Sequence, residues 1–414
     1  MWKIPPNLAK FSVQLTYMRI AVFIKSTSFH AGFGGLETQN LVLCEGLVKA
    51  GNEVTVFSPQ RELKIENSDL NGVKYVFVEC VNRTLFSFIN RESWLNKSYK
   101  SFLELHKVQP FNIVLSQSSA GIGVIKRKKE VGVKVVSVSH GSILSEFKTR
   151  ISDVSSVSDW VSIVKDLVFV LTIFFGRQRD FILNSDKIIA VSNFVKKAII
   201  DETYVSEERV KVIYNGIDPS SFSSEYINRD NNCVSILYVG RVIKSKGIDI
   251  ILESLSKTKD VDFFLNIVGD GNFTDTAKKL AEKLGISQEV KFHGKLEFSE
   301  IVRLLYRSDI FVMPTKRVEG FPMTMVEAMF SGIPIIATKI GGVSEAVWDE
   351  ETGFLVDTPN ASDLLRMLEV LINDKKLREE FGRNALNRAQ NLFSAGKMVE
   401  KYESVFREVL NENS

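Results

Sequence analysis

Two successive series of apolar strands and amphipathic helices dominate this chain of 414 residues. In the first half, short apolar runs such as residues 19–24 and 133–138 are separated by helical patterns such as residues 36–50. After a polar stretch the alternation starts again, for example with the apolar runs at residues 234–239 and 333–337. Nearly continuous apolar strands linked by amphipathic helices are typical of parallel sheets covered on both faces. The sequence therefore predicts an α/β protein with two parallel-sheet domains.

The length of the chain also favours two domains, because a single hydrophobic core stops growing at roughly 250–300 residues. The polar segment between the two series has no clear period and is typical of a linker. Met18 is an alternative start of translation, because the strand pattern begins directly after it. We predict an N-terminal extension, a Rossmann-like domain, a linker, a second Rossmann-like domain and a C-terminal helix, at residues 1–18, 19–215, 216–232, 233–395 and 396–414.

The balance of charges gives little reason to expect a nucleic-acid partner. The chain has 53 basic and 50 acidic residues, a net charge of only +3, whereas nucleic-acid binding usually needs a clear basic excess. The three cysteines are unclustered and the four histidines are scattered. We therefore expect no metal site, and a reducing, cytoplasmic location.

One segment, residues 314–345, combines several features that suit a ligand site. Its sequence is PTKRVEGFPMTMVEAMFSGIPIIATKIGGVSE, in which Glu319 and Glu327 are separated by a Gly-Phe-Pro elbow. The pattern predicts a strand, a loop, a short helix over residues 323–330, a second strand and a glycine loop. In open parallel sheets, ligands bind outside the carboxyl ends of the strands. The spacing of the two glutamates is by itself weak evidence for a ligand site, but the ordered combination of these features is specific.

This segment resembles the donor-sugar site of the retaining glycosyltransferases of family 4, which have two Rossmann-like domains (GT-B). The resemblance extends roughly from Arg19 to the C-terminus. It also rests on four other short motifs, Gly34-Gly35, residues 215–218, residues 240–247 and residues 268–271. It implies two domains that face a central cleft, with a C-terminal helix that crosses back to the first domain.

The resemblance assigns chemical roles to four side chains. It places Arg241 and Lys246 on the phosphates of the donor, where preorganised cations stabilise the charge of a leaving diphosphate. Glu319 resembles the carboxylate that positions the sugar or stabilises developing positive charge. His140 lies just past an apolar strand, at the position of a histidine that contacts the donor sugar. Taken alone, these residues are also consistent with a solvated turn, a helix-start glutamate and a loop histidine.

Further residues are expected to bind the nucleotide part of the donor. Glu327 matches the residue that accepts two hydrogen bonds from the ribose diol, which suits a carboxylate. The helix start at residues 323–330 presents free amides to phosphate. Pro322 has no N–H, so Met323 and Thr324 are the predicted donors.

A glycine-rich loop follows the first predicted strand. Gly34 and Gly35 allow the backbone to approach a ligand closely, and the resemblance places this loop opposite the donor diphosphate and the acceptor. A tight turn without a ligand is the alternative interpretation.

An apolar stretch at residues 160–175 allows two interpretations. Its longest uncharged run, residues 167–175, is nine residues long, whereas about twenty are needed to cross a bilayer. It is either a buried helix or a helix that lies on the membrane surface and approaches a lipid-linked acceptor.

The resemblance thus implies an enzyme that transfers a hexose-type sugar, with retention, from a UDP- or GDP-linked donor to a glycan or lipid-linked acceptor. We expect no cofactor and no metal, because no cluster of metal ligands is apparent. The motif and the apolar stretch favour surface-polysaccharide or glycolipid assembly, with contact at the inner face of the membrane. Two alternatives remain, a nucleotide-sugar epimerase of the same fold and a non-catalytic nucleotide-sugar-binding protein.

Overall fold

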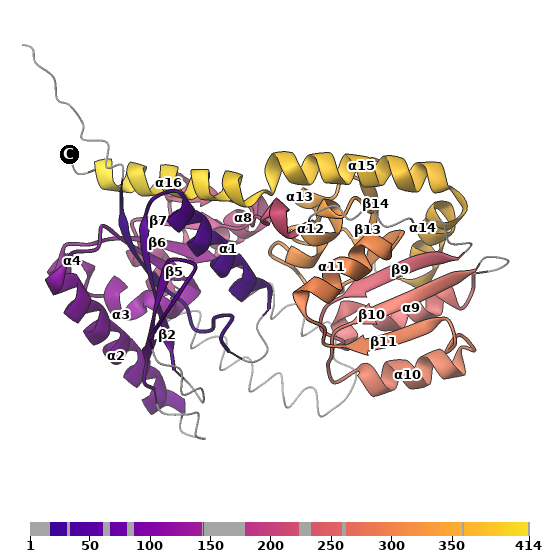
Figure 1. Cartoon of the computed structure of the whole chain (residues 1–414), viewed down its shortest axis with the longest axis horizontal. Coiled ribbons are helices and arrows are strands. Elements are labelled where there is room, and N and C mark those ends of the chain that lie inside the picture. The colour runs from indigo at the N-terminus through magenta and orange to yellow at the C-terminus, as the bar shows by residue number, and fades with distance from the viewer. Residues whose placement is uncertain are drawn as a thin grey trace, which may run out of the picture.

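The computed structural model shows two α/β domains side by side, with two long helices along one side of the pair (Figure 1). The structure describes residues 17–30, 34–60, 67–80, 87–142, 144, 179–222, 233–258, 262–357 and 360–412. The fold class predicted from the sequence, two parallel-sheet α/β domains, is confirmed.

The first domain is built on a sheet with eight described strands, in the order β3-β4-β2-β1-β5-β6-β7-β8. All neighbours in this sheet run parallel except β3 and β4. The central strands are buried along their whole length, which explains their continuous apolar sequences. The strands are β1 Arg19–Phe23, β2 Glu53–Pro59, β3 Ser68–Leu70, β4 Val73–Val78, β5 Ile113–Gln117, β6 Lys134–Ser139, β7 Lys187–Ala190 and β8 Val210–Val212.

Helices connect these strands and cover the sheet. The described helices of this domain are α1 Gly35–Lys49, α2 Ser87–Val108, α3 Ile122–Ile125, α4 Lys128–Val131, α7 Arg179–Asn184 and α8 Asn193–Thr203. The apolar stretch at residues 160–175 lies outside the described residues. None of the helices within the described ranges is long and apolar enough to cross a membrane.

The second domain has a sheet of six described strands, all parallel, in the order β11-β10-β9-β12-β13-β14. The strands are β9 Val234–Val239, β10 Phe263–Val268, β11 Val290–Gly294, β12 Ile310–Met313, β13 Ile335–Thr338 and β14 Gly353–Val356. The helices are α9 Ile248–Leu255, α10 Thr274–Lys283, α11 Phe298–Arg307, α12 Met323–Phe330, α13 Val343–Ala346, α14 Ala361–Asn373 and α15 Lys375–Leu392.

The strand order of each sheet reverses direction at one point. In the first sheet the chain moves outward from β1 on one side and from β5 on the other, and in the second sheet the same happens at β9 and β12. Such switch points leave a crevice at the carboxyl ends of the strands, where α/β proteins bind ligands. Each domain therefore offers one such crevice to a shared site.

The last helix, α16 (Ala395–Asn411), lies on the first domain (Figure 1). The Lys187 ammonium on β7 forms ion pairs with both Glu408 and Glu412, at 2.9 and 2.8 Å. The Asn52 amide donates to Glu403 at 2.8 Å. The chain therefore returns to its first domain through contacts with the strand β7 and with the residue that precedes β2.

The predicted linker at residues 216–232 is described only up to residue 222. Its first part forms a backbone bridge between Ile217 and Ser394, the residue just before α16. The two chain segments that connect the domains therefore run side by side at this point.

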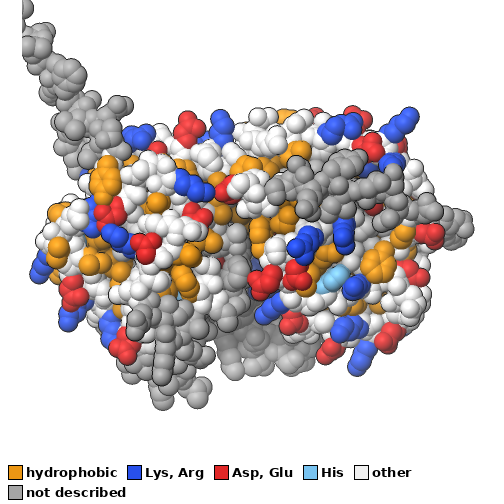
Figure 2. All heavy atoms as spheres, in the orientation of Figure 1, with side chains coloured by type: hydrophobic (Ala, Val, Ile, Leu, Met, Phe, Trp, Pro, Cys, Tyr) orange, Lys and Arg blue, Asp and Glu red, His pale blue; other side chains and the backbone are white. Residues whose placement is uncertain are grey.

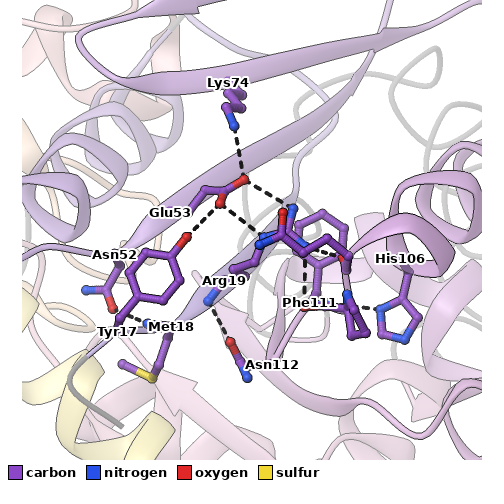
Figure 3. Close-up of polar contacts among 11 residues, drawn as sticks. Tyr17, Met18, Arg19, Asn52, Glu53, Lys74, His106, Phe111 and Asn112 are labelled. Atoms are coloured by element: carbon purple, nitrogen blue, oxygen red, sulfur yellow. Dashed lines mark hydrogen bonds and ion pairs between the residues drawn. The ribbon is translucent and has the colours of Figure 1, made fainter.

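A polar cluster closes the end of the first sheet that lies opposite the carboxyl ends of its strands (Figure 3). The Arg19 guanidinium binds both carboxylate oxygens of Glu53, each at 3.1 Å. Glu53 also accepts hydrogen bonds from the Tyr17 hydroxyl at 2.7 Å and from the Lys74 ammonium at 3.0 Å. The hydrogen bond from Arg19 is the main reason why the pKa of Glu53 falls from 4.5 to about 2. Residues 1–16 of the predicted N-terminal extension lie outside the described residues.

We expect Glu53→Gln to lower the free energy of unfolding at pH 7 by about 1–3 kcal/mol, because it removes a charged partner from a half-buried cluster. A carboxyl with a lowered pKa stabilises the fold above pH 4.5, and this contribution disappears as the pH falls toward 2. The difference between variant and wild type should therefore shrink between pH 5 and pH 2 in denaturant unfolding. Glu207→Gln, at an exposed ion pair with Lys196, serves as a control with little expected effect. A pH-independent difference for Glu53→Gln would contradict this assignment.

Candidate active site

A cavity of about 250 Å³ lies between the two domains, at both switch points. The first domain contributes the start of α1, the residue after β6 and the segment after β8. The second domain contributes the end of β9 and β12, the loop after β12 and the start of α12. The lining residues are Gly35, Leu36, His140, Asn215, Tyr238, Val239, Gly240, Lys246, Met313, Glu319, Gly320, Phe321, Pro322, Met323 and Thr324.

Lys246 and Glu319 meet in this cavity, although they are far apart in the sequence. Lys246 ends a short 3₁₀ helix (Lys244–Lys246) that follows β9, and Glu319 lies in the loop that follows β12. Their Nζ and Oε1 atoms are 2.6 Å apart, and both side chains are largely buried. The cation that the resemblance assigns to a phosphate therefore has a carboxylate partner within the protein.

Arg241 differs from this arrangement, because its side chain is exposed. Its neighbour Gly240 lines the cavity. The carbonyl oxygen of Arg241 accepts a hydrogen bond of 2.8 Å from the buried Tyr238 hydroxyl. Tyr238 was not among the predicted site residues. Its position near the carboxyl end of an otherwise aliphatic strand was the available signal.

The backbones of the two domains lie close together at His140 and Gly320. A Cβ atom on Gly320 would lie only 1.9 Å from the carbonyl oxygen of His140, so no larger residue fits there. Burial lowers the pKa of His140 to about 4. The imidazole in the cavity is therefore neutral at physiological pH.

Gly35 and Met323 form a second contact across the cavity. A Cβ atom on Gly35 would lie 3.3 Å from the Met323 side chain, so the start of α1 faces the start of α12. Thr324 also lines the cavity, and Pro322 stands just before the first helical residue of α12. The N–H of Gly34 is used within its own helix, where it donates to the Glu37 carboxylate at 2.8 Å.

Glu327 lies one turn into α12 and is 7% exposed. Its carboxylate has no hydrogen bond or ion pair to any residue in the described part of the chain. Burial raises its pKa to about 7. A buried carboxylate without a partner is costly, so a hydrogen-bond donor from outside the described residues would stabilise Glu327.

Glu345 on α13 joins the two domains beside the cavity. Its carboxylate accepts hydrogen bonds from the backbone N–H groups of Asn193 and Phe194, at 2.8 and 2.7 Å, and from the Tyr214 hydroxyl at 3.0 Å. Asn193 and Phe194 begin α8, and a carboxylate is favoured at the positive end of a helix. This contact holds the second domain against the first.

The described residues include no group of three or more histidine, cysteine, aspartate or glutamate side chains that is able to hold a metal ion. Of the acidic residues discussed above, Glu319 faces a lysine and Glu345 faces a helix start. Metal independence remains a prediction.

Comparison with known proteins assigns the chain to a family. A family model described as Glycosyltransferase Family 4 matches residues 33–221, and one described as Glycosyl transferases group 1 matches residues 222–388. The chain belongs to the family 4 glycosyltransferases. Together the two models span both domains of this glycosyltransferase and confirm the family predicted from its motifs.

Three known proteins illustrate the similarity. An uncharacterized glycosyltransferase of Methanocaldococcus jannaschii is 25% identical over 401 residues, which is 91% of this chain and 96% of the relative. The capsular polysaccharide biosynthesis glycosyltransferase CapM of Staphylococcus aureus is 29% identical over 55% of this chain and 62% of its own length. The structure of Anabaena HepE with UDP and glucose has a TM-score of 0.70 at 17% identity, over 94% of this glycosyltransferase and all of that chain.

We expect Glu327→Gln to stabilise the ligand-free glycosyltransferase. A carboxyl whose pKa is raised by folding destabilises the protein increasingly from pH 4.5 to about 7, and by a constant amount above that. The neutral amide avoids this cost, so the free energy of unfolding at pH 8 should rise by about 1–3 kcal/mol. Glu282→Gln, an exposed change on α10, is the matched control. Lower stability of Glu327→Gln at pH 8 would mean that the carboxylate has a partner.

Proposed function

We propose that this glycosyltransferase moves a hexose-type sugar from a UDP- or GDP-linked donor to a hydroxyl of a glycan or lipid-linked acceptor, with retention of configuration. The observation that carries the proposal is the pairing of Lys246 with Glu319 inside a cavity between two domains. The Anabaena neighbour holds UDP and glucose, which supports a nucleotide-sugar donor. The Staphylococcus aureus relative is named for capsular polysaccharide biosynthesis, which supports a role in surface-polysaccharide or glycolipid assembly.

In this proposal the Lys246–Glu319 pair exchanges partners when the donor binds. Lys246 turns to the diphosphate and stabilises the charge that grows there as the bond between the sugar and the phosphate oxygen breaks. The freed Glu319 carboxylate lies beside the sugar and stabilises its developing positive charge. The amides of Met323 and Thr324 at the start of α12 add to the phosphate site. Arg241 reaches the phosphates only if its exposed side chain turns inward.

The ribose is assigned to Glu327 in the same proposal. Two vicinal hydroxyls supply the donors that this buried carboxylate lacks. For retention, the acceptor oxygen bonds to the anomeric carbon on the face that the diphosphate leaves, and its proton passes to the leaving phosphate oxygen. This route requires neither a protein nucleophile nor a metal ion.

The proposed function is tested with a panel of nucleotide-sugars and the measurement of released nucleotide. We expect release from at least one UDP- or GDP-sugar, increased by an acceptor, and unchanged after treatment with EDTA. Activity that disappears with EDTA and returns with Mn²⁺ or Mg²⁺ would refute the metal-independent mechanism. Conversion of the donor sugar without any released nucleotide would instead identify an epimerase.

Lys246→Ala should reduce kcat by a factor on the order of 10²–10³, because the charge that Lys246 stabilises grows in the transition state. Lys244→Ala provides a matched control, since Lys244 is an exposed lysine on the same short 3₁₀ helix. It should leave turnover within about twofold of the wild type. A folded Lys246→Ala protein with full turnover would remove Lys246 from the mechanism.

Contact with the inner face of the membrane is also part of the proposal, and it rests on the sequence of residues 160–175. Apolar residues near Arg177 and Arg179 suit the boundary between acyl chains and anionic headgroups. We expect the wild type to float with anionic liposomes at low salt, and a double variant with Phe174→Asp and Phe175→Asp to remain at the bottom. A wild type that does not float would leave the stretch without a membrane role.

A further inference from the structure

A chain of three polar side chains leads from the half-buried His140 at the cavity to the buried Gln117 and Asn40 in the first domain. The Nε2 atom of His140 lies 2.7 Å from the Oε1 atom of Gln117. The Nε2 atom of Gln117 in turn donates to the Oδ1 atom of Asn40 at 3.0 Å. Gln117 and Asn40 are each only 2% exposed, so water does not compete for these hydrogen bonds. His140 is the member that reaches the cavity.

The fold brings these residues together at the switch point of the first sheet. Gln117 is the last residue of β5, and His140 follows the last residue of β6, the parallel neighbour of β5. Asn40 lies on α1, the helix whose first residue lines the cavity. The chain of hydrogen bonds therefore connects three successive parts of the ligand-binding edge.

The two amide groups set the direction of these hydrogen bonds. The Gln117 NH₂ group donates to the Asn40 oxygen. That leaves the Gln117 oxygen for His140, and an oxygen can only accept. His140 must therefore carry its proton on Nε2.

The second ring nitrogen of His140 then has a free lone pair. Burial keeps the ring neutral, so a proton on Nε2 leaves none on Nδ1. Nδ1 has no hydrogen-bond partner among the residues for which the structure gives positions. The groups with charge on the other side of the cavity are Lys246 and Glu319, which bind each other.

We propose that Gln117 and Asn40 are positioning residues that hold His140 as the Nε2–H tautomer, so that Nδ1 accepts a hydrogen bond from a hydroxyl of the donor sugar. This inference rests on the proposed function for its ligand. The sugar group that contacts Nδ1 must therefore donate a hydrogen bond. A carboxylate at the same position would be repelled by the Nδ1 lone pair. It also means that His140 contacts the donor as a neutral group and not as an acid.

The tautomer is measured directly in the ligand-free protein labelled with ¹⁵N-histidine, with long-range ¹H–¹⁵N spectra. There are four histidines, and the loss of one set of signals in His140→Gln assigns the resonances. We expect the Nε2–H pattern at pH 7, without titration down to about pH 5. An Nδ1–H pattern, or a titration between pH 6 and 7, would overturn the proposal.

Two variants of Gln117 separate positioning from general destabilisation. Gln117→Glu keeps the acceptor but adds a negative charge, so the His140 pKa should rise by about 1–3 units. Gln117→Met keeps the length but removes the acceptor, so the spectra should show a mixture of tautomers. The control is Gln39→Met, because Gln39 is a buried neighbour on α1 whose amide contacts Met398. It should leave the His140 signals unchanged, and identical signals in all three variants would refute the role of Gln117.

Steady-state kinetics tests whether the His140 tautomer affects sugar transfer. Gln117→Met should lower kcat/KM for the nucleotide-sugar by about tenfold, equivalent to one hydrogen bond, with unchanged affinity for the free nucleotide diphosphate. Unchanged kcat/KM with mixed tautomers would overturn the contact between His140 and the sugar. If the wild type instead turns over no nucleotide-sugar, the proposed function fails, whereas the spectra still decide the positioning of His140.

Discussion

The site depends on a contact between two backbones, the one at which Gly320 meets the carbonyl oxygen of His140. Because Gly320 has no side chain, the loop after β12 reaches the edge of the first sheet. Because of that approach, Glu319 and His140 line the same cavity between the domains. The Glu345 carboxylate at the start of α8 holds the same two surfaces together from the side. A larger residue at position 320 would separate all of these groups at once.

Glu319 and Glu327 differ in how their charge is compensated. Glu319 has Lys246 at 2.6 Å, so the two charges compensate each other. Glu327 has no such partner among the described residues, and burial alone raises its pKa. A protein optimised only for stability would have another residue at this position. A carboxylate that costs stability is typical of a functional site. The Glu327 carboxylate therefore lowers the stability of the fold more than the Glu319 carboxylate does.

Much of the fold was predictable, because the apolar periodicity is strong. The strand at residues 234–239 has the predicted bounds, and both sheets are parallel as expected, except for the short edge strand β3. Contacts between distant segments were not predictable in the same way. Lys246 and Glu319 were proposed for separate roles, and no local pattern shows that they form a pair. Gln117 was missed because its importance comes from the neighbouring strand β6 and from α1, which only the folded sheet places beside it.

The position of α16 has a consequence for the order in which the protein is made. This helix follows both domains in the chain and so leaves the ribosome after them, yet it covers α1 in the first domain. Val399 packs so closely against Gly46 that a Cβ atom there would lie 2.4 Å from the valine. Until α16 has emerged, the first domain therefore presents an uncovered apolar surface, and Lys187 lacks its ion pairs with Glu408 and Glu412. N-terminal domains generally fold first during synthesis, but this one completes its surface only after the second domain has emerged.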